Sequence, residues 1–169
     1  MPLLENGRPV QNTWRYVAEG EALDTGDIIV PLERLTEGLA HMGGRVGVLL
    51  PADAQVSALK EALPKLALVA VTFPIFRDGR AFSQARALRE HLHFTGDIRA
   101  TGHVLPDQYE MLIRCGVSTV EVPDGTDLSV WAHALDQFDV AMQPSPVLDE
   151  KPTGFAFRRL LDRVTEKAG

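Results

Sequence analysis

The chain has 169 residues, of which 45% are hydrophobic and 24% are charged, the composition of a globular protein with a sizeable core. Its formal net charge of -6 argues against a nucleic-acid binder, because such proteins usually carry a basic stripe. The single cysteine, Cys115, excludes an internal disulfide framework and any CxxC metal or redox pair, and we expect it to be a small buried residue.

No apolar run approaches the roughly 20 residues that a helix needs to span a bilayer. The first residues lack the basic stretch and apolar core of a signal peptide. We therefore expect a cytoplasmic protein with no membrane partner.

Residues 1–44 are expected to form short strands and turns that pack as a β-rich appendage against a main sheet. Asn6-Gly7 is a dipeptide typical of a tight hairpin turn. Residues 14–17 alternate like a strand, and an apolar strand is expected at 28–30. A short helix is expected to begin near Pro31.

Residues 45–143 show a regular alternation of apolar runs and helical patterns. Strands are expected at residues 46–50, 66–73, 97–101 and 117–122, with a last edge strand at 139–142. Helices are expected at residues 53–63, with Asp53 as N-cap, and at 82–92, 106–115 and 127–138.

This order predicts one α/β domain of four to five mainly parallel strands that alternate with helices through right-handed crossovers. An open sheet is the first expectation, and a partial (β/α) barrel is the alternative, because spacing does not separate the two. Residues 144–169, which begin with two closely spaced prolines, are expected to form a C-terminal tail, either docked or mobile.

In either topology, ligands bind beyond the carboxyl ends of the parallel strands, which selects residues 51–53, 73–83, 101–108 and 123–127. The second and third of these loops are the richest in polar groups. The loop after the second core strand contains Asp78, Gly79 and Arg80, which offer a carboxylate, a permissive backbone and a planar cation. Ser83 is expected near the start of the next helix, where a hydroxyl and free amides suit an anion. The opposing interpretation is an ordinary turn in which Asp78 and Arg80 pair with each other.

The loop after the third core strand is the second candidate. His103 has Asp107 close by, which is compatible with a general acid–base pair, although a lone loop histidine is more often simply exposed. Together the two loops predict an anion or partner site. Its candidate ligand-binding residues are Asp78, Gly79, Arg80, Ser83, Arg99, Gly102, His103, Asp107 and Gln108.

Familiar catalytic motifs are missing from the sequence. There is no GxGxxG after the first core strand, no GxxxxGK[ST], no GxSxG and no HExxH. We therefore expect no bound metal and assign no cofactor, and the sequence leaves open whether the protein is an enzyme. Trp14 and Trp131 are interpreted as packing aromatics.

Three segments resemble the bacterial family known as domain of unknown function 934. They are FPIFRDGRAFSQARALR at residues 73–89, GDIRATGHVLPDQ at 96–108 and IRCG at 113–116. The resemblance is close over residues 66–143 and extends to 30–34. It highlights Phe73, Phe76, Asp78, Gly79, Arg80, Ser83, Ala85, Leu88, Arg89, Gly96, Arg99, Gly102, Asp107, Gln108 and Gly116.

The chain departs from this family pattern at two positions. His103 stands where an aspartate is expected, which weakens any scheme that needs a carboxylate there, and it equally weakens a family-wide role for this histidine. Met142 replaces an expected aromatic residue, a change that packing can tolerate.

The resemblance implies a metabolic context but no specific reaction, because members of this family are commonly encoded beside genes of assimilatory sulfate and sulfite reduction. It implies an accessory protein that assists sulfite reductase or its electron donor. The alternative is a small α/β enzyme or sensor that binds an oxyanion or a phosphorylated metabolite at the carboxyl ends of the strands.

Overall fold

The structure is a computed structural model that describes residues 1–135. The strands are β1 (Leu3–Glu5), β2 (Arg8–Val10), β3 (Arg15–Tyr16), β4 (Ile28–Pro31), β5 (Val46–Leu50), β6 (Leu68–Phe73), β7 (Asp97–Gly102) and β8 (Thr119–Glu121). The α-helices are α1 (Leu35–Leu39), α2 (Arg80–Glu90), α3 (Tyr109–Arg114) and α4 (Leu128–Ala134). Short 3₁₀ turns are η1 (Leu32–Arg34), η2 (Val56–Leu59), η3 (Leu63–Lys65) and η4 (Pro106–Gln108). The expected helix end at residue 138, the strand at 139–142 and the tail lie outside the described residues.

All of these strands belong to one sheet with the order β2-β1-β8-β7-β6-β5-β4-β3. Strands β3 to β8 are parallel, whereas β1 pairs antiparallel with both β8 and β2. The α/β class is confirmed, but the expected four to five strands were too few. The N-terminal strands form no separate appendage, because they extend both edges of the same sheet.

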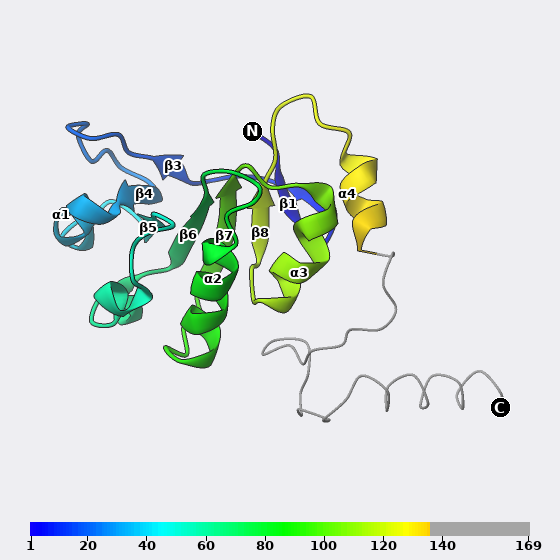
Figure 1. Ribbon diagram of the computed structural model, residues 1–169. Helices are drawn as coiled ribbons and strands as arrows, with labels where there is room; N and C mark the ends of the chain where they lie inside the picture. The colour runs from blue at the N-terminus through cyan, green and yellow to red at the C-terminus, as the bar shows by residue number, and fades with distance from the viewer. Residues whose placement is uncertain (136–169) are drawn as a thin grey trace, which may run out of the picture.

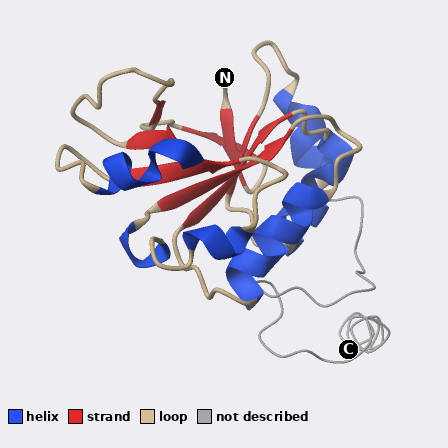
Figure 2. Ribbon diagram, turned by 60° about the vertical axis from the view of Figure 1, so that its left-hand side comes forward, coloured by secondary structure: helices blue, strands red, loops and turns tan. Residues whose placement is uncertain are grey.

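The spatial order of the parallel strands follows their order in the chain, so each right-handed crossover moves one position in the same direction. Helices α2, α3 and α4 therefore gather on one face of the sheet (Figures 1 and 2). The sheet curls away from them into a half-barrel whose edges are β2 and β3. The partial barrel describes this architecture better than a flat open sheet.

The face of the sheet that meets the helices is apolar. Val48, Val71 and Val120 are fully buried there and share one core with residues of the helices. Tyr109 and Trp131 meet edge to face in this core, with their ring centroids 5.5 Å apart. Trp131 is thus a packing aromatic as expected, and Cys115 is buried as expected.

The opposite, concave face carries a buried ion pair between neighbouring strands. The Arg99 guanidinium on β7 donates from Nη1 to Glu121 Oε1 on β8 at 3.1 Å, and both side chains are at most 4% exposed. Thr101 Oγ1 donates to the other carboxylate oxygen of Glu121 at 2.7 Å. Arg99 Nη1 also donates to Asn12 Oδ1 at 3.2 Å. The pair therefore ties β7 and β8 to the segment that links the two sheet edges.

That segment, which connects β2 to β3, crosses the concave face behind β6, β7 and β8 in the view of Figure 1. Trp14 is the last residue of this segment and shares a buried cluster with Leu68 and Ala70 of the concave face, which confirms its packing role. Burial raises the pKa of Tyr16 to about 12, and the nearby Glu121 carboxylate adds to this effect. Tyr16 of the edge strand β3 therefore lies within electrostatic range of Glu121 on β8.

The prediction of an α-helix at residues 53–63 is wrong. The segment forms the 3₁₀ turns η2 and η3 instead, and Asp53 caps no helix. Leu59 at the end of η2 and Ala62 between the two turns are both buried. Pro64 directly follows the expected helix, and a proline disfavours the α conformation of the residue before it.

Removing Glu121 should strongly destabilise the fold, because it leaves the Arg99 guanidinium buried without its counter-charge. For Glu121→Ala we expect urea unfolding to show a loss of about 3–5 kcal/mol. The matched control is Glu5→Ala on the same sheet, where the side chain is exposed and the change should stay within about 0.5 kcal/mol. The double variant Arg99→Met/Glu121→Leu should be more stable than Glu121→Ala. A Glu121→Ala protein as stable as the Glu5→Ala control would contradict this role for the pair.

Candidate functional site

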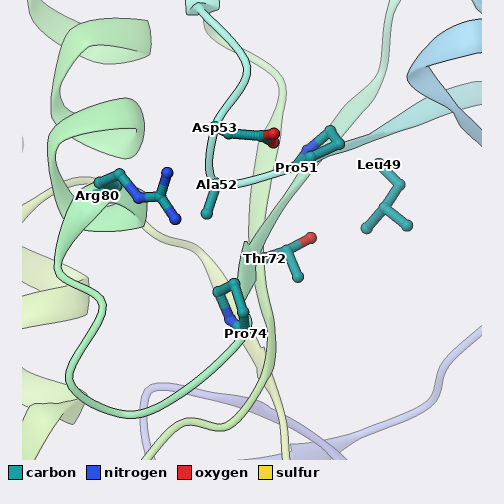
Figure 3. Close-up of a pocket in the computed structure, with 7 residues that line it drawn as sticks. All are labelled: Leu49, Pro51, Ala52, Asp53, Thr72, Pro74 and Arg80. Atoms are coloured by element: carbon teal, nitrogen blue, oxygen red, sulfur yellow. The ribbon is translucent and has the colours of Figure 1, made fainter.

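A cleft of about 450 Å³ lies at the carboxyl ends of β5 and β6, next to the first residue of α2 (Figure 3). The carboxyl edge of the parallel strands is where the sequence placed the site. The cleft is lined by Leu49, Pro51, Ala52, Asp53, Thr72, Pro74 and Arg80.

Arg80 is the cation of the cleft, and Asp78 holds it in place. The carboxylate of Asp78 accepts from Arg80 Nη2 at 2.5 Å, from Nε at 2.9 Å and from the backbone N–H at 3.1 Å. The Arg80 side chain is nevertheless 56% exposed. Within residues 1–135, Arg80 Nη1 donates no hydrogen bond. The expected internal pairing thus exists, and it leaves one nitrogen of the guanidinium available to a ligand.

These hydrogen bonds from Arg80 lower the pKa of Asp78 from 3.8 to about 2. Since the folded-state pKa is depressed, the stabilising contribution of the pair is fully present above the ordinary aspartate pKa and is lost as the pH falls through about 2. At physiological pH Asp78 is therefore a permanent anion beside Arg80.

The wall opposite α2 is held by Gln84, a residue that the sequence analysis did not select. Gln84 is buried, and its Nε2 donates to the carbonyl oxygens of Pro51 at 2.8 Å and Ala54 at 2.9 Å. A polar residue on an otherwise apolar helix face was the only sequence signal for it. These bonds fix residues 51–54 against α2 and so set the width of the cleft.

Two further polar groups of the cleft were also missed. Thr72 Oγ1 is buried and has no hydrogen-bond partner within residues 1–135. Asp53, expected as a helix cap, is exposed and lines the cleft instead. Both lie at or just beyond strand ends. The strand-end rule did select residues 51–53, but Asp53 was interpreted there only as a helix cap.

The two predicted loops do meet, and Gln108 joins them. Its Oε1 accepts from the backbone N–H of Leu105 at 3.0 Å, and its Nε2 donates to the carbonyl oxygen of Phe76 at 2.9 Å. Gln108 therefore braces the loop after β6 against the loop after β7, and it does not line the cleft.

Three other predicted residues also lie outside the cleft. His103 and Asp107 are exposed on the second loop. Ser83 is exposed and is the fourth residue of α2, because the helix begins at Arg80, earlier than expected. Its hydroxyl is therefore not at the helix start, where an anion would be received.

Arg99 is likewise separate from the cleft, because it pairs with Glu121 on the concave face. Arg89 also has a structural role. This half-buried side chain donates to the carbonyl oxygens of Phe94 at 2.5 Å, Gly96 at 2.8 Å and Gly116 at 3.0 Å. Both arginines hold the scaffold of the site together rather than receiving a ligand.

Three large apolar side chains are exposed on the two bridged loops. Ile75 is 57% exposed, Phe76 is 47% exposed and Leu105 is 40% exposed. The guanidinium of Arg77 lies 5.3 Å from the centre of the Phe76 ring. We call Ile75, Phe76 and Leu105, which lie on the two loops that Gln108 bridges, the apolar rim.

Within residues 1–135, no group of three or more histidine, cysteine, aspartate or glutamate residues is arranged to hold a metal ion. None of the helices described here is long and apolar enough to cross a membrane.

The molecule is therefore an α/β half-barrel protein with a polar cleft at the carboxyl ends of two adjacent strands. A family model for bacterial proteins of unknown function (DUF934) matches residues 47–153. Because the match covers more than half of the chain, the chain belongs to this family. The comparison with curated proteins found no match.

Gly79 and Gly102, two predicted site residues that do not line the cleft, should respond very differently to substitution. Gly102 has a φ of +96°, and a Cβ there would lie 2.4 Å from the carbonyl oxygen of Phe73. Gly79 has a φ of -81° and open space around it. We expect Gly102→Ala to cost at least about 2 kcal/mol in urea unfolding and Gly79→Ala at most about 1 kcal/mol. Equal effects would show that the bridged loops do not constrain Gly102.

Proposed function

We propose that this protein binds a small ligand with an anionic group in the cleft between residues 51–53 and the start of α2. The main support is the cleft itself, at the carboxyl ends of parallel strands. It combines the exposed guanidinium of Arg80 with the buried hydroxyl of Thr72, which has no hydrogen-bond partner within residues 1–135.

The groups of the cleft are suited to hold such an anion. Arg80 Nη1 and the hydroxyl of Thr72 are both able to donate to oxygen atoms of a ligand. Asp78 keeps the guanidinium in one orientation, so that little side-chain entropy remains to be lost on binding. Among the anions expected from the sequence, one with a single charge suits Arg80 best, because Asp78 already neutralises part of its charge.

Replacement of Arg80 should weaken anion binding in the cleft. We expect acetate, a monoanion, to shift the amide resonances of Ala52, Thr72 and Arg80 in NMR titrations of the full chain, and sulfate or phosphate to shift them less. Arg80→Gln should reduce the affinity of the probes that bind at least about tenfold, since a hydrogen bond to a charged group is worth about 1.5–3 kcal/mol. Arg77→Gln, a nearby change outside the cleft, is the control and should leave affinity unchanged. An Arg80→Gln protein that binds these anions as well as the control would refute the proposal.

The second candidate function is that of an accessory protein of assimilatory sulfite reduction, which assists sulfite reductase or its electron donor. The main support for this function is the resemblance of residues 73–108 to the family. The apolar rim supports it, because exposed apolar side chains on braced loops are suited to contact a partner protein.

The accessory function predicts a growth defect that depends on the sulfur source. A deletion strain of the host bacterium should grow more slowly on sulfite and normally on sulfide, and the intact gene should restore growth. The variant Phe76→Ser should restore it poorly if the rim contacts the partner, whereas Met111→Ser, also exposed but outside the rim, should restore it fully. Undiminished growth of the deletion strain on sulfite would contradict the accessory function.

A further inference from the structure

We infer that the ligand of the cleft is a zwitterion of the amino-acid type, with its carboxylate at Arg80 and its ammonium group at Asp53. This inference rests on the proposed binding function and specifies the chemical class of the ligand.

The cleft contains opposite charges that do not pair with each other. Asp53 lines it, and no hydrogen bond or ion pair joins Asp53 to another residue of the described chain. The pKa of Arg80 is raised mainly by its hydrogen bonds to Asp78, and to a smaller extent by the charge of Asp53, which places the two cleft residues within electrostatic range. In Figure 3 the guanidinium points toward the loop that carries Asp53. A ligand with two charges of opposite sign would satisfy both side chains.

A phosphate group suits this cleft poorly. Phosphate sites at strand ends usually rely on backbone N–H donors, and here Pro51 and Pro74, which follow β5 and β6 directly, have none. Asp53 and Asp78 place two carboxylates near the single cation Arg80, so the local charge is negative. A dianion would be repelled, whereas a zwitterion has no net charge to repel.

The remaining walls suit the body of an amino acid. Leu49, Pro51, Ala52 and Pro74 present mainly apolar surface between the charged groups. The buried hydroxyl of Thr72, which lacks a partner within residues 1–135, is a further polar group in the lining of the cleft. The volume of about 450 Å³ lies in the range of small-molecule sites and leaves space for a side chain.

The test compares matched ligands with the full chain. Each of the twenty protein amino acids is titrated by NMR, and the tightest one is then compared with its analogue lacking the amino group and its analogue lacking the carboxylate. We expect the amino acid to bind at least about tenfold more tightly than either analogue. Inorganic phosphate should bind more weakly than the amino acid.

Two variants separate the contributions of the charges. Asp53→Asn should weaken binding of the amino acid at least about tenfold and leave the deaminated analogue unaffected, whereas Arg80→Gln should weaken both. Glu61→Gln, an exposed carboxylate outside the cleft, is the control and should change neither.

The outcomes distinguish this inference from the function on which it rests. If the deaminated analogue or phosphate binds as tightly as the amino acid, and Asp53→Asn changes nothing, the zwitterion is refuted while anion binding at Arg80 stands. If no probe shifts the cleft resonances, the proposed binding function is refuted together with the inference.

Discussion

The buried ion pair between Arg99 and Glu121 is the interaction on which the shape of this molecule depends. Both charges are nearly inaccessible to water, so each must keep its partner or leave an uncompensated charge in the interior. The pair lies on the concave face, where the helices do not reach, and through Asn12 it holds the segment that joins the two sheet edges. The curl of the sheet and the one-sided placement of the helices are consistent with this arrangement.

The cleft is held in place by a separate set of side-chain contacts. Gln84 on α2 holds the 51–54 wall, and Asp78 orients the guanidinium of Arg80. Pre-ordered groups bind a ligand at a lower entropic cost than mobile ones, which is why two exposed loops can carry a site. The second loop contributes support through Gln108 rather than ligand contacts. Small-ligand binding in the cleft and partner binding at the apolar rim would therefore use adjacent but separate surfaces.

The face of the sheet on which Arg99 lies could be recognised from the sequence. Ile98 and Ala100 are apolar while Arg99 and Thr101 are polar, and a strand sends alternate side chains to opposite faces. This alternation places Arg99 away from the helices and therefore in the interior of the curl. The identity of its partner, Glu121, could not be read in the same way, because it depends on the register between β7 and β8.

Local sequence determined the hairpin at Asn6-Gly7, the core strands, and the position of Asp78 and Arg80 after a buried strand, because these features depend on neighbouring residues. Only the tertiary structure decided that the N-terminal strands form the edges of the main sheet and that Asp53 lines a cleft instead of capping a helix. The reason is that these outcomes depend on contacts between residues far apart in the chain, such as Gln84 with the carbonyl oxygen of Pro51. No local pattern encodes such contacts.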